Sequence, residues 1–158
     1  MSVPHTFDLH IPGNPVPKGR PRVYRGHGVT PKRTRDAEQR IRNLFRRQVP
    51  DGILYPSERL LVRMDFWLNK TGRPDLDNIM KLCLDALNGL AYADDEQIEA
   101  VWARRYMPDR RVPAKRGGTR WRRAGDSYTF LGEPYEPHTH IHIEPLNTQQ
   151  PTIQEETS

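Results

Sequence analysis

A chain of 158 residues with a net charge of +5 is long enough for one domain with one hydrophobic core. It has no apolar run approaching the length of a membrane span and no signal-peptide-like apolar segment, so we expect a soluble, cytoplasmic protein without a membrane partner. Its single cysteine excludes an internal disulfide, and Cys83 falls on an apolar helical stripe, which favours core packing over a reactive thiol.

Charge is segregated along the chain. Residues 15–50 carry eleven Lys or Arg against two acids, and residues 104–123 carry nine against one. Residues 57–101 instead hold nine acids against five bases, and residues 124–158 hold six acids and no Lys or Arg. Basic segments around an acidic centre suit a nuclease, because cations bind a polyanion while carboxylates bind a metal. A merely solvated surface is the alternative, although most of the bases are Arg, which grips phosphate with two parallel hydrogen bonds.

The first half of the chain alternates between strand and helix signals. Alternating apolar residues over 7–11 predict a strand, and the Pro- and Gly-rich residues 13–33 predict a long loop. Thr34 is a predicted N-cap for a helix that stops before Pro50. The apolar stripe of that helix consists of Ala37, Ile41, Leu44 and Phe45.

The second half completes one small domain. Residues 60–68 give the clearest strand pattern, and a helix follows from about Asp77 to Asn88. Strands over about 97–106 and 139–144 complete the core. We therefore expect an α+β fold over residues 1–146, with a mixed sheet and two main helices.

Two segments fall outside the expected core. Residues 107–137 are rich in Arg, Gly and Pro and form a long basic insertion between two strands, in which Trp121 lies among arginines and could stack on an unpaired base. Residues 147–158 are a polar tail, which we expect to be disordered.

Two acidic clusters flank the second predicted helix. Asp75 and Asp77 are separated by one residue, and in an extended segment they would point the same way and hold one hard cation. The helix then returns the chain toward Asp94 and Asp95, either of which could close the cluster. The pattern predicts a divalent-metal site for phosphate chemistry, with Lys81 placed to stabilise negative charge in the transition state.

Each of these features also has a simpler structural interpretation. Asp77 by itself is typical of a helix N-cap. Lys81 lies four residues from both Asp77 and Asp85, so an exposed ion-pair ladder would explain it. Adjacent aspartates in a polar turn are ordinary, and only their combination with Asp75 and Asp77 indicates a site.

Three alternating histidines, His138, His140 and His142, would share one face of a strand and raise the possibility of zinc. Three ligands on successive same-face positions of one strand are geometrically awkward, so exposed positions with Ile141 and Ile143 pointing inward are the preferred interpretation. The Asp-x-Asp motif of nucleotide-sugar transferases is another alternative, but such enzymes need a longer α/β domain and leave the basic segments unexplained.

The acidic region resembles a known family. The run Arg-Pro-Asp-Leu-Asp-Asn-Ile-Met-Lys at 73–81, Leu-Asp-Ala-Leu-Asn-Gly at 84–89 and Ala-Asp-Asp-Glu-Gln-Ile at 93–98 resemble the RusA-type Holliday-junction resolvases. The proline-rich basic segment at 15–22 is similar to that of many members. The resemblance implies a small homodimer that uses Mg²⁺, with Mn²⁺ as a substitute. It implies metal-binding catalytic roles for Asp75, Asp77 and Asp95, a supporting metal role for Asp94, and an essential role for Lys81.

These expectations describe a metal-dependent endodeoxyribonuclease acting on four-way junction DNA, associated with the nucleoid when bound. A symmetric dimer suits this reaction, because a junction needs matched cuts in two opposed strands. The alternative is a non-catalytic, basic DNA-binding protein of phage or recombination origin, which Mg²⁺-dependent nicking would exclude. The bases expected to contact DNA are Lys18, Arg20, Arg22, Arg73, Arg104, Arg105, Arg120 and Arg122.

Overall fold

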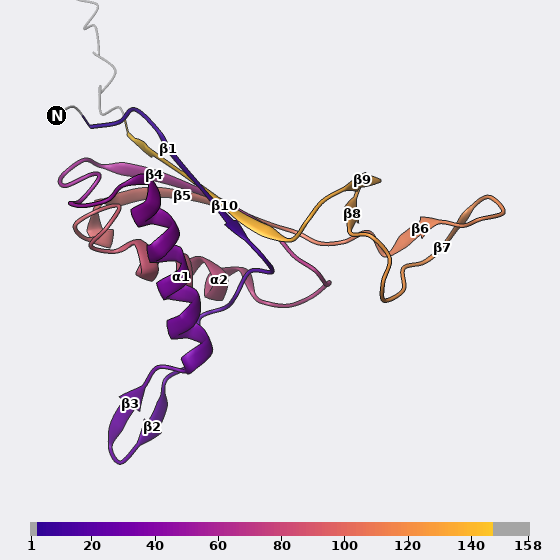
Figure 1. Ribbon diagram of the computed structural model, residues 1–158, viewed down its shortest axis with the longest axis horizontal. Helices are drawn as coiled ribbons and strands as arrows, with labels where there is room; N and C mark the ends of the chain where they lie inside the picture. Colours follow the sequence, from indigo (N-terminus) through magenta and orange to yellow (C-terminus); the bar gives the residue numbers. More distant parts are fainter. Residues whose placement is uncertain (1–2, 147–158) are drawn as a thin grey trace, which may run out of the picture.

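A four-stranded sheet with both main helices on one face forms the body of the protein (Figure 1). The computed structural model describes residues 3–146. The strand order is β1-β10-β4-β5, with antiparallel pairs except for the parallel pair β4 and β5. The bounds are β1 Phe7–Pro12, β4 Leu60–Trp67, β5 Ile98–Tyr106 and β10 His138–Pro145. The predicted α+β fold with a mixed sheet and two helices is confirmed.

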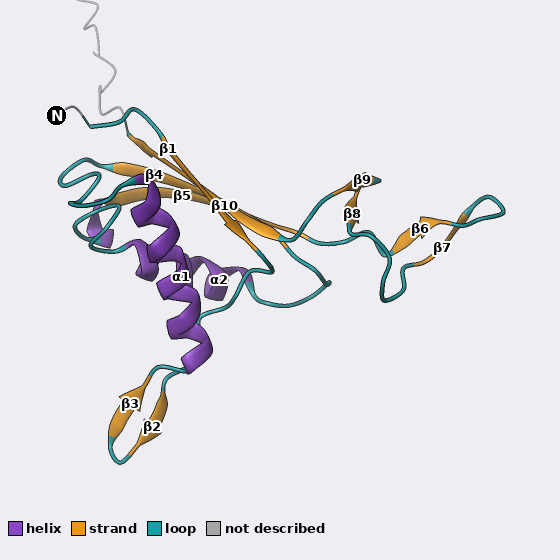
Figure 2. Ribbon diagram, viewed as in Figure 1, coloured by secondary structure: helices purple, strands orange, loops and turns teal. Residues whose placement is uncertain are grey.

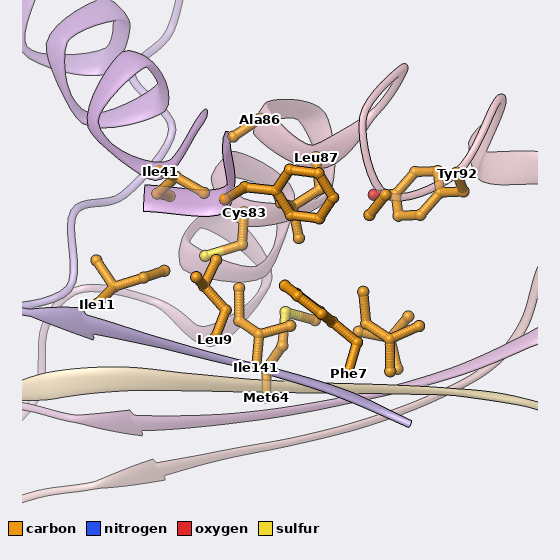
Figure 3. Packing of buried hydrophobic residues seen from close by; sticks show 14 of the residues in the cluster. Phe7, Leu9, Ile11, Ile41, Met64, Cys83, Ala86, Leu87, Tyr92 and Ile141 are labelled. Carbon is orange, nitrogen blue, oxygen red and sulfur yellow. The ribbon is translucent and has the colours of Figure 1, made fainter. Parts of the chain in front are cut away.

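The helices α1 (Lys32–Gln48) and α2 (Leu76–Leu87) pack against each other and cover the sheet. The inward face of the sheet is apolar because β1, β10 and β4 pair in a register that puts their alternating hydrophobic residues on one side. Figure 3 shows these side chains meeting those of the helices. The rings of Phe7 and Phe45 lie 5.2 Å apart between centroids, and Ile141 is fully buried. Burying each such side chain stabilises the fold by roughly 1.5–3 kcal/mol.

Cys83 belongs to this core. It lies on the inward face of α2 and is 4% exposed. Burial raises the pKa of its thiol to about 12, so the thiol stays protonated and unreactive at neutral pH. The prediction of a packing role is confirmed.

Short hairpins project from the body (Figure 2). One of them, β2 (Arg22–Tyr24) with β3 (His27–Val29), extends beyond the start of α1. Residues 107–137, here called the arm, project from the far end of the sheet and contain two further hairpins. These are β6 (Arg111–Pro113) with β7 (Thr119–Trp121), and β8 (Thr129–Phe130) with β9 (Glu133–Pro134).

The hairpin β2–β3 corrects the prediction of one long loop over residues 13–33. Its turn places Arg25 and Gly26 at positive φ angles of 48° and 79°. Two successive positive φ angles are typical of the tight turns that join hairpin strands, but Asn-Gly or Asp-Gly is their usual signature. The Arg-Gly pair therefore gave no strong hairpin signal.

Thr34 is not the N-cap of α1, which corrects a second prediction. The cap position lies three residues earlier, at Pro31, and the helix begins at Lys32. Thr34 is buried, and its Oγ1 accepts a hydrogen bond from the Gly19 amide at 2.9 Å. A Cβ on Gly19 would lie 2.8 Å from that oxygen, so only glycine allows the loop to approach so closely. The proline-rich segment is thereby fixed against α1.

The remaining predicted boundaries agree with the structure to within a few residues. The helix α2 ends at Leu87 and Gly89 follows with φ 82°. None of the helices within residues 3–146 is long and apolar enough to cross a membrane. The predicted tail at 147–158 lies outside the described residues.

Candidate active site

Asp75 and Asp77 lie at the start of α2. Asp75 is the N-cap residue, with extended backbone angles, and Asp77 is in the first helical turn. The expectation that both lie in one extended segment is therefore wrong, and so is the N-cap interpretation of Asp77. Both carboxylates are exposed to solvent at the helix end that carries partial positive charge, where an anion is stabilised.

The loop before Asp75 is fastened by the end of β5. Nη1 of Arg105 donates to the carbonyl oxygens of Gly72 and Pro74, each at 3.0 Å. Earlier in the same loop, the backbone N–H of Asn69 donates to Oδ1 of Asn14 at 2.9 Å. Arg105 was predicted to bind DNA, but its guanidinium is used to hold the backbone that leads into Asp75. Sequence reasoning missed this positioning role, since nothing in the local sequence links residue 105 to residues 72–74.

Asp94 and Asp95 form a second acidic pair after α2. They begin a short 3₁₀ helix (Asp95–Gln97), and Asp94 and Gln97 form a reciprocal capping box. Oε1 of Gln97 accepts the amides of Ala93 and Asp94 at 2.8 and 3.1 Å. Its Nε2 donates to the carbonyl of Tyr55 at 2.8 Å. Gln97 thus anchors the turn to the core, and the Asp-x-x-Gln spacing was a signal that could have identified it.

The pKa of Asp95 is raised above its usual value. The first cause is its hydrogen bond with Asp94, followed by the negative charge of Asp94, with a smaller contribution from Asp85. Two adjacent carboxylates without a cation repel each other, so one retains a proton more readily. A hard divalent cation would relieve that repulsion, and an oxygen-only donor set is what Mg²⁺ prefers.

The two acidic pairs do not meet within one protomer. Asp75 and Asp85 are separated by about 15 Å of helix, at 1.5 Å of rise per residue. The Asp94–Asp95 turn lies near Asp85. Tyr92, two residues before Asp94, donates its hydroxyl proton to the carbonyl of Leu84, which holds the start of this turn against the end of α2. Within residues 3–146, no group of three or more His, Cys, Asp or Glu side chains is arranged to hold a metal. The expectation that the chain itself closes one carboxylate cluster is therefore wrong, because the intervening helix is a rigid spacer.

Lys81 lies between the two pairs, midway along α2 and exposed. The alternative ladder interpretation required Lys81 to pair with Asp85. Asp85 instead binds Lys18, whose Nζ lies 2.8 Å from its Oδ2 and 2.6 Å from Oε1 of Glu38. Partial burial alone would lower the pKa of Lys18, but its hydrogen bonds with Asp85 and Glu38 raise it. Lys18 therefore ties the proline-rich loop to both helices.

A cationic hollow adjoins Asp75. It has a volume of about 280 Å³ and lies between the proline-rich loop and the loop before α2. Four of its lining residues are bases, namely Lys18, Arg33, Lys70 and Arg73. Cations beside a carboxylate are the arrangement expected where a phosphate approaches a bound metal.

The residues predicted to contact DNA divide into two groups. Arg20, Arg22 and Arg73 are exposed, and so is Arg104, whose guanidinium lies over the rings of Tyr106 and Phe130. The other four, Lys18, Arg105, Arg120 and Arg122, have protein partners.

Arg120 and Arg122 form hydrogen bonds within the arm. Arg120 makes two 2.8 Å hydrogen bonds with Asp126, and these lower the pKa of that carboxyl well below its usual value. Arg122 donates to the backbone carbonyl of Asp126, and its guanidinium lies 4.6 Å from the centre of the Tyr128 ring. Both side chains therefore stabilise the fold of the arm through Asp126.

The histidines of β10 have structural partners. Thr139, Ile141 and Ile143 point into the core, so the three histidines lie on the opposite face, as predicted. Nε2 of His140 and Nδ1 of His142 each lie 2.9 Å from Oδ1 of Asp8 on β1. A network of this kind stabilises two paired strands and gives His140 and His142 a structural role.

A comparison with protein-family models finds a match that covers the candidate site. A family model described as "Endodeoxyribonuclease RusA" matches residues 12–115, which include both acidic pairs and Lys81. No curated protein matches the chain. Because the match covers about two thirds of the sequence, the chain belongs to the RusA family of Holliday-junction-resolving endodeoxyribonucleases.

Proposed function

We propose that the protein is a Mg²⁺-dependent nuclease that resolves four-way DNA junctions as a symmetric homodimer. The observation that carries this proposal is the arrangement along α2, with Asp75 and Asp77 at its start, Lys81 midway along it, and Asp94 and Asp95 in the turn that follows it. A cationic hollow of about 280 Å³ adjoins the first pair, which supports phosphate as the bound group. Family membership supports DNA as the substrate.

Asp75, Asp77 and Asp95 are the proposed metal ligands, with Asp94 in support. Their oxygen donors fit Mg²⁺, with Mn²⁺ as a substitute. A bound divalent cation supplies polarisation of the phosphate and a water of lowered pKa. Lys81 neutralises charge that develops on the reacting phosphate, and the exposed bases of the hollow, Arg33, Lys70 and Arg73, orient the DNA backbone.

The separation of the two acidic pairs supports a site shared between protomers. A two-fold axis perpendicular to α2 near its midpoint exchanges the ends of two neighbouring helices. Asp75 and Asp77 of one protomer then approach Asp94 and Asp95 of the partner subunit. Each dimer has two such sites, related by the same symmetry as the two strands that a junction resolvase must cut. Dimerisation in this proposal completes the metal centre as well as matching the substrate.

Replacing the ligands one at a time tests the metal centre. We expect Asp75→Asn, Asp77→Asn and Asp95→Asn to abolish Mg²⁺-dependent nicking of a four-way junction, because each removes a ligand's charge. Junction binding in EDTA should be unchanged or tighter, since an anion near phosphate has been removed. Asp94→Asn should impair nicking less than Asp95→Asn.

Asp51→Asn is a matched control, because Asp51 is an exposed carboxylate in a turn outside the candidate site. Wild-type nicking rates in all three ligand variants would exclude this assignment. Normal binding without any Mg²⁺-dependent nicking by the wild-type protein would favour the non-catalytic alternative.

Lys81→Ala tests whether this exposed lysine acts on the phosphate. Loss of one preorganised charge at such a site commonly lowers the rate about a hundredfold or more. We expect a slowed nicking rate at saturating Mg²⁺, with thermal stability and junction affinity close to wild type. Lys32→Ala removes another exposed lysine, one that is paired with Asp36 on α1, and should leave the rate unchanged. Full activity of Lys81→Ala would assign this residue to solubility alone.

Arg105→Ala tests the positioning role of the guanidinium that holds the loop before Asp75. Without its two hydrogen bonds, Asp75 should be less precisely placed, so the nicking rate falls while the salt dependence of junction binding is unchanged. Arg105→Lys should restore part of the rate. If Arg105 binds DNA instead, the substitution will weaken binding and reduce the salt dependence, with little effect on the rate at saturating DNA.

A further inference from the structure

A second groove lies between the arm and the loop that leads to the candidate site. It has a volume of about 450 Å³. One wall is the loop containing Lys70 and Thr71, and the other includes Arg110, Trp121 and Arg122 of the arm. The groove therefore combines two exposed cations with a large aromatic ring.

Trp121 is exposed to an extent unusual for tryptophan. It lies on β7 with 64% of its surface accessible, and the guanidinium of Arg111 on β6 is 4.8 Å from the ring centre. Arg111 is itself held by Thr119, to which its Nε and Nη2 donate at 2.9 and 3.0 Å. A ring fixed in this way offers a ready platform for a flat ligand.

The walls of the groove are held in place by the arm's own contacts. Asp109 accepts hydrogen bonds from Thr129, Leu131 and Gly132 at 2.8 to 3.0 Å, and these lower its carboxyl pKa, the Gly132 amide having the largest effect. At the base of the arm, Trp67 stacks on Tyr106 with centroids 4.0 Å apart. Phe130 meets both rings edge-on. These contacts brace β8–β9 against the end of the sheet, and Asp109 ties that hairpin to the segment that leads into β6, the strand paired with the one carrying Trp121.

Lys70 links the groove to the candidate site. The same side chain lines both this groove and the hollow beside Asp75. A DNA strand in the groove would follow cations from Arg110 to Lys70 and then to Arg73. This path leads toward the carboxylates at the start of α2. Residues 116–137 of the arm lie outside the matched family region, so the groove is built partly from sequence that the family model does not include.

We propose that the groove binds a single DNA strand at the branch point, with an unpaired base stacked on Trp121 and flanking phosphates bound by Lys70 and Arg110. Aromatic stacking on bases together with a cationic track is the usual means of binding single strands. The proposal rests on the proposed function for its substrate, but it concerns binding and does not depend on catalysis. Within duplex DNA the neighbouring base pairs cover every base face, so only the two ends offer a face to Trp121.

Binding in EDTA tests the groove separately from the metal centre. A four-way junction, a splayed duplex and a blunt duplex, the first two with 2-aminopurine at the branch, are titrated with wild type and variants. We expect Trp121→Ala to bind the splayed duplex about tenfold more weakly and to lose fluorescence quenching of the branch base. Trp121→Phe should retain most of both signals. Blunt-duplex binding should change little.

Matched controls are present in the same chain. Trp102→Ala removes another exposed tryptophan that also lies against an arginine, Arg63, at 4.4 Å from the ring centre. Arg116→Ala removes a cation from the arm outside the groove, whereas Lys70→Ala and Arg110→Ala remove cations within it. We expect only the latter two to weaken splayed-duplex binding more than blunt-duplex binding.

The proposal is overturned if Trp121→Ala binds and quenches like wild type, or if its loss is equal for splayed and blunt duplexes. Thermal melting checks that each variant is folded, and Trp121→Phe keeps the test valid if the alanine variant loosens the arm. If the proposed nuclease function is wrong but the groove proposal is right, the wild-type protein quenches the branch base normally and does not nick DNA in Mg²⁺. Failure of the groove alone leaves nicking dependent on Asp75 but insensitive to Trp121.

Discussion

The rigidity of α2 is the constraint on which the candidate site depends. A helix has a fixed rise per residue, so α2 holds the carboxylates at its start apart from those in the turn that follows it. The surrounding structure reinforces this separation: Arg105 fastens the loop before Asp75, and Gln97 fastens the turn containing Asp94 and Asp95. The protomer therefore presents two well-positioned acidic pairs instead of one closed cluster. Dimerisation supplies the simplest way to join them.

Basic residues have two distinct tasks in this protein. Lys18, Arg105 and Arg120 bind protein carbonyls or carboxylates and fix the loops around the candidate site and the arm. Others, such as Arg73 and Lys70, are exposed beside the hollow near Asp75. Net charge attracts a polyanion at long range, but the second group is the more exposed of the two and is better placed to contact it. Counting bases along the sequence does not separate these tasks, because the partners come from distant parts of the chain.

The fold was largely predictable from periodicity. The alternating residues of β4 and β10 and the apolar stripe of α2 specify their buried faces locally, and their register follows from those faces. Thr34 was misassigned because its hydroxyl serves a contact with Gly19, which no local pattern contains. The hairpins in the arm depend on turns and on contacts such as Asp109 with Thr129, and their apolar positions are too few to show a period. The acidic residues were likewise identified from the sequence. Their separation was not, because it depends on how α2 and the turn after it are placed in the fold.

Complementation between inactive variants tests most directly whether the metal centre is shared by two protomers. Asp75→Asn and Asp95→Asn chains carrying different tags are co-expressed, the heterodimer is purified through both tags, and nicking of a four-way junction is measured. In a shared site, one of the two centres in the heterodimer contains both substitutions and the other contains neither. The account therefore predicts that both homodimers are inactive and that the heterodimer nicks one strand. A heterodimer as inactive as its parents would show that each centre is built within a single chain.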